Sequence, residues 1–226
     1  MALRQTLLPF LYDLLHRYHA DYEPMVRPTW LDFPNDPGAW AESDDHLLGP
    51  DLLVALVCEP GAIMRVVRPP AGADWIDVWT GARLPGGAAA TLDAPLDGPP
   101  PLLARVGSAM LVDLARGGWR PEPYRRGIWL FPPTEGEVAW EAVEDAGDGD
   151  HPPARWRLSG RADTERIDLE LTCEGPIVFG DDRVTLLLSP GDKRALRING
   201  GVAERVSIDG RDGITLTVTS GDRPDG

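Results

Sequence analysis

Two tryptophans and an aspartate at alternate positions are the residues of this chain best placed for chemistry. Residues 75–79 read Trp-Ile-Asp-Val-Trp, and on a strand Trp75, Asp77 and Trp79 would share one face because successive side chains alternate. A carboxylate between two indole rings would suit a sugar, since aromatic side chains offer broad apolar faces beside polar groups. Aromatic side chains are also frequent packing residues. We favour packing for these three and keep sugar binding as the alternative.

The four histidines do not form a metal-binding pattern. His16 and His19 are one helical turn apart and could share a ligand, but no third ligand accompanies them. His46 and His151 are isolated in predicted loops. We therefore expect satisfied or solvated histidines, and we predict no metal and no cofactor.

Composition and charge indicate which kinds of binding partner are disfavoured. The 226 residues carry a formal net charge of −14, which disfavours nucleic acid and anionic membrane surfaces. No apolar run approaches the roughly 18 residues of a membrane-spanning helix. The first residues lack the pattern of a secretory signal, so we expect a cytoplasmic protein. Cys58 and Cys173 are too few for a disulfide framework, and we expect two small buried or half-buried thiols.

The chain begins with a helical pattern and continues with short strands. Apolar residues recur at helical spacing over residues 3–22, which predicts an amphipathic helix with Pro9 at a kink or in the first turn. Residues 24–33 are expected to be extended, and residues 52–57 form an apolar run typical of a strand covered on both faces. From Ile63 onward the apolar period is two.

Gly- and Pro-rich turns separate these predicted strands, which is typical of β-sandwiches. We therefore predict a mainly β chain with two antiparallel β-sandwich domains. The proximal sandwich would occupy residues 49–115, and the distal one residues 128–226. Residues 116–127, rich in Gly, Pro and Arg and without periodicity, are the predicted linker.

Seven stretches, in order and at the right spacing, resemble glycoside hydrolase family 31, the α-glucosidases, α-xylosidases and their relatives. They cover roughly residues 1–113, and the later part resembles the distal β domain of that family more weakly. The stretches are Leu7-Leu-Pro-Phe-Leu-Tyr-Asp-Leu14, Pro24-Met-Val-Arg-Pro28, Phe33-Pro-Asn-Asp36, Asp44-Asp-His-Leu-Leu-Gly-Pro-Asp-Leu-Leu-Val-Ala55, Glu59-Pro-Gly-Ala62, Trp75-Ile-Asp-Val-Trp-Thr-Gly81 and Pro95-Leu-Asp-Gly98.

The resemblance implies that residues 1–48 are the helix-strand end of a catalytic (β/α)8 barrel, which the two sandwiches follow. The nucleophile and the acid/base carboxylate of the family lie upstream of this point, so the resemblance implies that this chain has no catalytic residues. Arg27 would lie on the last barrel strand. It could reach toward a sugar site or pair with a nearby acid, and we favour the pair because buried arginines need a partner.

No substitute pair of carboxylates is evident in the sequence. Retaining hydrolysis requires two carboxylates about 5 Å apart. Asp44 and Asp45 would point to opposite faces of an extended chain, and we expect them to cap or turn the backbone. Glu144-Asp145 and Asp181-Asp182 are placed in turns, with a calcium site as the less favoured alternative.

Three hypotheses follow from these observations. In the first, the chain is the C-terminal segment of a family 31 enzyme, supports the barrel and is inactive alone. In the second, it is a carbohydrate-binding module that uses the face of Trp75, Asp77 and Trp79. In the third, it is a complementing subunit that docks its apolar helix, residues 3–22, onto a separately encoded barrel, or self-associates through that helix.

Overall fold

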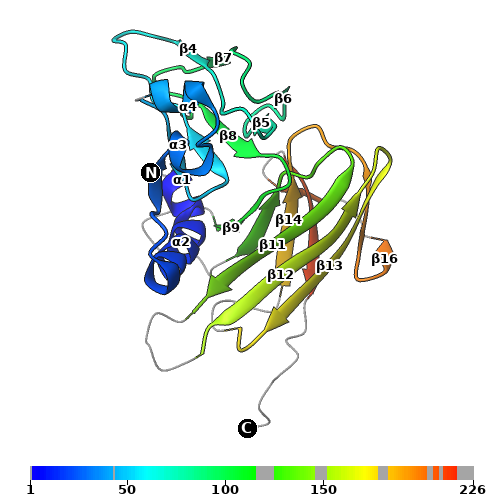
Figure 1. Ribbon diagram of the computed structural model, residues 1–226. Helices are drawn as coiled ribbons and strands as arrows, with labels where there is room; N and C mark the ends of the chain where they lie inside the picture. The colour runs from blue at the N-terminus through cyan, green and yellow to red at the C-terminus, as the bar shows by residue number, and fades with distance from the viewer. Residues whose placement is uncertain are drawn as a thin grey trace. The chain divides into compact units, whose positions relative to one another are not determined.

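The computed structural model describes residues 2–42, 44–115, 125–145, 152–177, 183–202, 206–208 and 211–217. The chain is mainly β, as predicted, and divides into two compact units (Figure 1). We call one the proximal unit, formed by Tyr18–Val106 and Ser189–Gly191. The other is the distal unit, formed by Met1–Arg17, Gly107–Leu188 and Asp192–Gly226.

The proximal unit contains a six-stranded sheet and a two-stranded ribbon. The sheet has the order β1-β2-β3-β8-β5-β6, and β4 pairs with β7 in the ribbon. Since β1 and β2 belong to the same sheet as β3, the boundary predicted after residue 48 falls inside this sheet. The strands are β1 (Val26–Pro28), β2 (His46–Leu48), β3 (Leu52–Val54), β4 (Met64–Val67), β5 (Trp75–Asp77), β6 (Arg83–Leu84), β7 (Ala90–Asp93) and β8 (Leu102–Arg105).

One apolar core unites the layers of the proximal unit. It takes side chains from the sheet, from the ribbon and from the segment between β1 and β2. Alternation along each strand turns one set of side chains inward, so burial of this set fixes the strand register. The buried core residues are Phe33, Ala39, Leu47, Leu53, Ala55, Val67, Trp75, Leu92 and Leu103.

The segment between β1 and β2 is helical, where the sequence predicted an extended chain for residues 24–33. Only β1 is extended, and α3 (Thr29–Asp32) and α4 (Pro37–Ala41) follow it. The prediction was wrong over α3 because tertiary contacts favour one helical turn: it buries Phe33 in the core, and Thr29 Oγ1 donates to the Ala39 carbonyl at 3.0 Å. α4 supplies a second short helical segment around Ala39, whose side chain is buried.

The amino-terminal helix is broken once. α1 (Ala2–Thr6) ends before Leu7, and α2 (Leu8–Asp21) carries Pro9 in its first turn, where a missing N–H costs little. Within the distal unit, Asp13 on the buried face of α2 accepts a hydrogen bond from the Val143 N–H at 2.8 Å. Burial raises the pKa of Asp13.

Arg17 completes this attachment of α2 to β11 (Gly136–Glu144). Its Nε lies 3.1 Å from Asp13 Oδ2, and its terminal nitrogen donates to the Glu141 carbonyl at 2.8 Å. A charged pair and two backbone groups are therefore satisfied together, which fixes the inner face of the helix.

The distal unit is a β-sandwich of two five-stranded sheets. Their orders are β17-β18-β14-β10-β9 and β11-β12-β13-β15-β16, and side chains from both fill one apolar core. Besides β11, the strands are β9 (Ala109–Asp113), β10 (Arg126–Leu130), β12 (Ala154–Ala162), β13 (Arg166–Glu174), β14 (Arg183–Leu188), β15 (Ala195–Ile198), β16 (Gly201–Val202), β17 (Val206–Ile208) and β18 (Arg211–Thr217).

Two features of this sandwich differ from the sequence prediction. The pairs β10–β14 and β13–β15 are parallel, so the sheets are mixed rather than wholly antiparallel. Strand β9, which the predicted boundaries assign to the proximal sandwich, instead pairs with β10 from Arg126 to Leu130. Four of the five side chains of β9 are buried, so both faces of this strand are covered.

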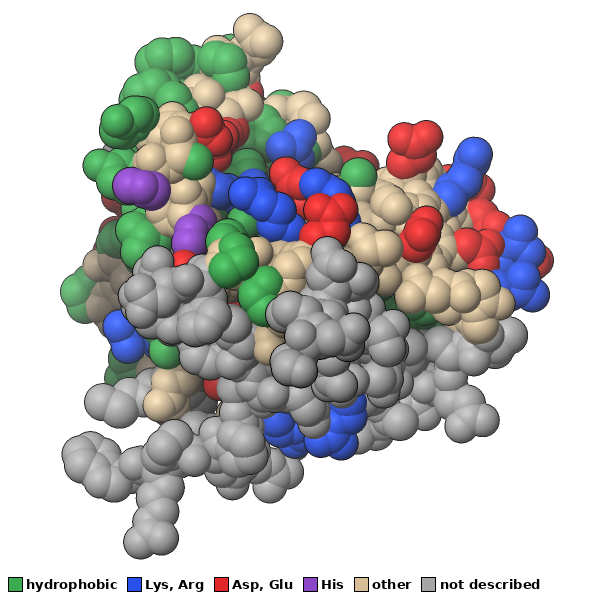
Figure 2. Space-filling view, turned by 90° about the horizontal axis from the view of Figure 1, so that it is seen from below, with side chains coloured by type: hydrophobic (Ala, Val, Ile, Leu, Met, Phe, Trp, Pro, Cys, Tyr) green, Lys and Arg blue, Asp and Glu red, His purple; other side chains and the backbone are tan. Residues whose placement is uncertain are grey.

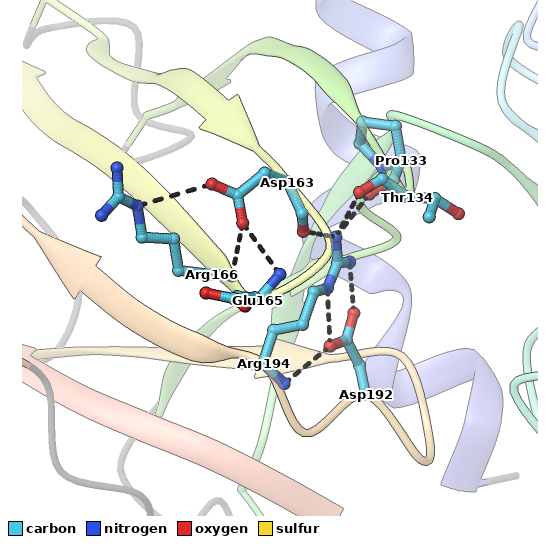
Figure 3. Close-up of polar contacts among 7 residues, drawn as sticks. All are labelled: Pro133, Thr134, Asp163, Glu165, Arg166, Asp192 and Arg194. Carbon is cyan, nitrogen blue, oxygen red and sulfur yellow. Dashed lines mark hydrogen bonds and ion pairs between the residues drawn. The ribbon is translucent and has the colours of Figure 1, made fainter.

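Arg194 links three loops of the sandwich, those between β10 and β11, between β12 and β13 and between β14 and β15 (Figure 3). Its guanidinium donates to the Asp192 carboxylate and to the carbonyls of Pro133, Thr134 and Asp163, at 2.6–3.0 Å. These carbonyls belong to turns that no strand pairing satisfies, so one arginine replaces several missing backbone partners. The Asp163 side chain accepts from the N–H groups of Glu165 and Arg166, which lowers its pKa.

A buried ion pair lies in the interior of the sandwich. The Arg126 guanidinium contacts Glu144 Oε2 at 2.8 Å, and the same oxygen accepts from the Trp156 indole N–H at 3.2 Å. The guanidinium also lies over the Trp156 ring, 4.9 Å from its centroid. Cys173 is buried as predicted, and burial raises its pKa to about 11. Cys58 is exposed, so that part of the prediction was wrong.

The face of the molecule in Figure 2 shows acidic and basic side chains interspersed. No helix in the described part of the chain is long and apolar enough to cross a membrane.

Replacing Glu144 with alanine should destabilise the distal unit strongly. The change leaves the Arg126 charge and the Trp156 N–H buried without this acceptor, and loss of one partner of a buried pair costs about 3–5 kcal/mol. Glu174→Ala is the matched control, because Glu174 pairs with Arg157 on the same sheet but in solvent. We expect that control to cost less than about 1 kcal/mol. Equal losses for the two variants, measured by urea unfolding, would contradict this account.

Candidate functional site

The three residues predicted as a possible sugar-binding face do not form an exposed surface. Trp75 is fully buried (0% exposed), and its indole N–H donates to the Pro70 carbonyl at 3.1 Å. Asp77 is also buried. Trp79 is half-buried in the turn after β5, with its indole N–H donating to the Pro100 carbonyl at 2.7 Å. The ring of Trp75 is therefore a core element in this unit.

Asp77 organises the turn that follows β5. Its Oδ1 accepts hydrogen bonds from the N–H groups of Trp79 and Thr80, at 2.7 and 2.9 Å, as in an Asx turn. Gly81 closes the turn with φ = 76°, and a Cβ placed there would lie 1.9 Å from the Pro190 carbonyl oxygen. The turn thus requires an acceptor at 77 and a glycine at 81 for structural reasons.

Arg27 is buried and paired, as the sequence analysis favoured. Its guanidinium contacts Asp32 Oδ1 at 3.3 Å and Glu23 Oε2 at 3.4 Å, and its Nε donates to the Pro24 carbonyl at 2.9 Å. Burial raises the pKa of Asp32 in spite of this arginine. All three nitrogens of Arg27 are thus engaged within the segment from residue 23 to residue 32.

The three histidines in the described part of the chain do not share a ligand site. His16 Nε2 lies 3.0 Å from Asp145 Oδ2, while His19 is exposed on α2. His46 is half-buried in β2 rather than in a loop, and His151 lies outside the described residues. Among the described residues, no group of three His, Cys, Asp or Glu side chains could hold a metal ion.

The adjacent acids predicted in turns have separate structural settings. Glu144 lies in β11 and belongs to the buried pair with Arg126, so its predicted placement in a turn was wrong. Asp145 contacts His16, and its hydrogen bond with Tyr12 raises the pKa of that phenol. Asp181 and Asp182 lie outside the described residues.

Asp36 accepts four hydrogen bonds within the proximal unit. It accepts from the Gly38 N–H at the start of α4, from the Ala71 N–H and from both terminal nitrogens of Arg68, all at 2.7–2.9 Å. The hydrogen bonds from Arg68 hold the pKa of Asp36 at about 2 and raise the pKa of Arg68. The Asp36 carboxylate therefore caps α4 and pairs with Arg68 at the same time.

Asp45 is the opposite case, a buried acid with too few partners. Its Oδ1 contacts Arg65 at 3.1 Å, whereas its Oδ2 is buried without a hydrogen-bond partner. Glu42 lies 3.9 Å from the same guanidinium and accepts from the N–H groups of Asp44 and Asp45. Burial, and then the charge of Glu42, raise the pKa of Asp45 to about 6. The backbone-capping role expected for Asp45 therefore belongs to Glu42.

These settings leave little carboxylate chemistry in the described part of the chain. Its buried carboxylates are each committed to an arginine or to backbone N–H groups. Glu42 and Asp45 come closest to a pair, but both face the Arg65 guanidinium. General acid/base catalysis on a sugar requires carboxylates directed at the substrate, an arrangement that these contacts do not provide.

An exposed aromatic pair was missed by the sequence analysis. Trp30 on α3 and Trp40 on α4 stack with ring centroids 4.9 Å apart and an interplanar angle of 12°. Their exposed fractions are 36% and 58%. The two residues are ten positions apart on a segment without periodicity, so only the folded segment brings them together.

Part of the chain matches a known protein family. Residues 22–110 match the family model described as the Glycosyl hydrolase family 31 C-terminal domain. The 1,3-alpha-isomaltosidase of Kribbella flavida is 44% identical over 96 residues, which are 42% of this chain and 13% of that protein. Alpha-glucosidase 2 of Bacillus thermoamyloliquefaciens is 29% identical over 147 residues, 65% of this chain and 18% of that protein.

A solved structure has the same fold over nearly the whole chain. The Flavobacterium johnsoniae GH31 dextranase complexed with glucose superposes with a TM-score of 0.76 at 22% identity, covering 95% of this chain and 30% of the dextranase. This chain therefore spans less than a third of the dextranase and less than a fifth of the two curated relatives.

Asp45 and Asp36 should change the stability of the proximal unit in opposite directions. The raised pKa of Asp45 means that its protonated form favours folding: this contribution is complete below pH 3.8 and is lost as the pH rises through about 6. Asp45→Asn should therefore stabilise the unit by about 1–2 kcal/mol at pH 7.5 and flatten its pH dependence between those values.

Asp36→Asn is the matched control with the opposite sign. The pKa of Asp36 is lowered, so its contribution is present above pH 3.8 and is lost as the pH falls toward about 2. We expect this variant to lose about 2 kcal/mol at pH 7.5. Hydrogen exchange at the buried Leu53 and Leu103 amides would measure the change in the free energy of unfolding for both variants. A destabilising Asp45→Asn substitution at pH 7.5 would refute the unpaired-acid account.

Proposed function

We propose, from the premise that this chain carries the C-terminal domain of glycoside hydrolase family 31, that it is the non-catalytic C-terminal portion of an α-glucosidase-like enzyme. In this proposal, the β-rich units support a catalytic (β/α)8 barrel, and the reacting carboxylates belong to another part of the enzyme.

The observation that carries this proposal is the commitment of the buried acids. Asp36 binds Arg68, Glu144 binds Arg126, and Asp77 caps its own turn. A carboxylate held in this way cannot approach a sugar carbon as a nucleophile without breaking several charge-assisted hydrogen bonds. The partial coverage of the relatives supports the same proposal, since most of their length lies outside the matched segment.

The purified 226-residue protein should not hydrolyse 4-nitrophenyl α-glucoside or isomaltose. The expected rate equals that of buffer, because the buried carboxylates in the described part of the chain are held by arginines or backbone N–H groups and do not form a nucleophile and acid/base pair. Alpha-glucosidase 2 of Bacillus thermoamyloliquefaciens, assayed in parallel, is the positive control for the 4-nitrophenyl α-glucoside assay. Turnover by this chain that persists after repurification would contradict the proposal.

A second candidate is a complementing subunit that docks through the amino-terminal helix, or a chain that self-associates there. The inner face of α2 is buried at Phe10 and Leu14 and held by Asp13, while Leu8 and Leu15 on the same helix are exposed. An apolar stripe that remains in water while the opposite face is fixed favours an interaction with another apolar surface.

Self-association through this stripe is open to a direct test. The double substitution Leu8→Glu and Leu15→Glu adds charge to the exposed stripe without touching the face that holds Asp13. We expect concentration-dependent association of the wild-type chain in sedimentation velocity and a monomer for the double variant. A wild-type chain that stays monomeric at high concentration would exclude self-association. Docking onto a separately encoded barrel would then be tested by co-purification of the chain with that barrel.

A further inference from the structure

We propose that the stacked pair Trp30–Trp40 is a carbohydrate-binding platform, on which a pyranose ring of an α-glucan oligosaccharide packs against the outer face of the Trp40 indole. The proposal rests on the proposed function for the class of ligand. It does not involve Trp75, Asp77 or Trp79, the surface that the sequence suggested.

The geometry of the pair provides a flat apolar surface in solvent. The two rings are nearly parallel, at 12°, so one face of Trp40 is covered by Trp30. With more than half of Trp40 exposed, its remaining face is accessible. The C–H-rich face of a pyranose is apolar, and its hydroxyl groups lie at the ring edge, which suits an amphipathic indole with water around it.

The platform is rigid before any ligand arrives. The Trp40 indole N–H donates to the Pro34 carbonyl at 2.8 Å, which fixes the ring orientation. Thr29 Oγ1 donates to the Ala39 carbonyl and ties α3 to α4, and the Asp36 carboxylate caps α4 through the Gly38 N–H. A preorganised surface loses little conformational entropy on binding, so a single stacked ring can contribute measurable affinity.

Charge favours a sugar over a nucleobase on this surface. Stacked aromatic rings also bind nucleic-acid bases, but such sites combine them with positively charged grooves. The net charge here is −14, and two arginines that contact the segment carrying the platform are paired with acids, Arg68 with Asp36 and Arg27 with Asp32. A neutral oligosaccharide meets no such electrostatic barrier.

The test is a titration of the full 226-residue chain with isomaltotriose, and separately with maltotriose. Tryptophan fluorescence and amide chemical shifts of α3 and α4 would be followed. We expect saturable shifts for at least one of the two sugars, centred on Trp40. Trp40→Ala should weaken binding about tenfold, equivalent to about 1.4 kcal/mol, and Trp40→Phe should retain part of it.

Tyr18→Ala is the matched control, because Tyr18 is another exposed aromatic residue that stacks, edge to face, on Tyr22. It should leave the titration unchanged. Hydrogen exchange of the Leu53 amide would verify that each variant is folded. Absence of saturable shifts with both sugars, or equal binding by wild type and Trp40→Ala, would overturn the platform.

A Trp40→Ala variant that lost self-association instead of sugar binding would also overturn the platform, in favour of a protein contact.

Failure of the platform is separable from failure of the proposed function. Turnover of 4-nitrophenyl α-glucoside by the chain contradicts the proposed function alone, whereas an inactive chain that binds no sugar contradicts the platform alone.

Discussion

The carboxylate of Asp36 is the contact on which the arrangement of the proximal unit depends most. It joins two segments that are far apart in sequence, because it caps α4 next to it and also accepts from the Ala71 N–H and from both terminal nitrogens of Arg68, 32 to 35 positions away. The space for this contact is reserved by Gly38, where a Cβ would lie 2.0 Å from Arg68 Nη1. Helix cap, ion pair and close approach therefore form a single interdependent feature.

The same physical requirement recurs in both units. A charge removed from water needs a partner, and in this chain the partner is usually an arginine that also satisfies backbone carbonyls. Arg194 does so for the distal turns, and Arg17 for the attachment of α2 to β11. Asp45 departs from this pattern, since one of its oxygens is buried without a hydrogen bond, and the mismatch appears as a raised pKa. A buried carboxylate that is paired with an arginine stabilises the fold but is not available as a catalytic group. Most buried carboxylates of the described residues are paired in this way.

Periodicity made most of the architecture predictable. The mainly β class, the helix with Pro9 in its first turn and strands such as β8 and β14 follow from local patterns. The errors were of another kind. The turn of α3, the exposure of Cys58 and the pairing of β9 with β10 depend on contacts between distant segments, which no local pattern contains. The candidate sugar-binding surface could not be judged from local pattern either. Trp75 and Trp79 have the spacing of a sugar-binding strand, but Trp75 is buried in the core and Trp79 lies in a turn.

The stacked pair Trp30–Trp40 shows how a structural brace can also prepare a binding surface. The hydrogen bonds that close the segment from Thr29 to Trp40 are needed to bury Phe33 and Ala39 in the proximal core. Once that core is closed, the helical turns direct their other side chains outward, and the two indoles meet in solvent. Their rigidity then arises from the contacts of Asp36 and Thr29 together with the hydrogen bond from the Trp40 indole to the Pro34 carbonyl. A platform of this kind requires no carboxylate of its own, which makes it compatible with a chain whose buried acids already serve the fold.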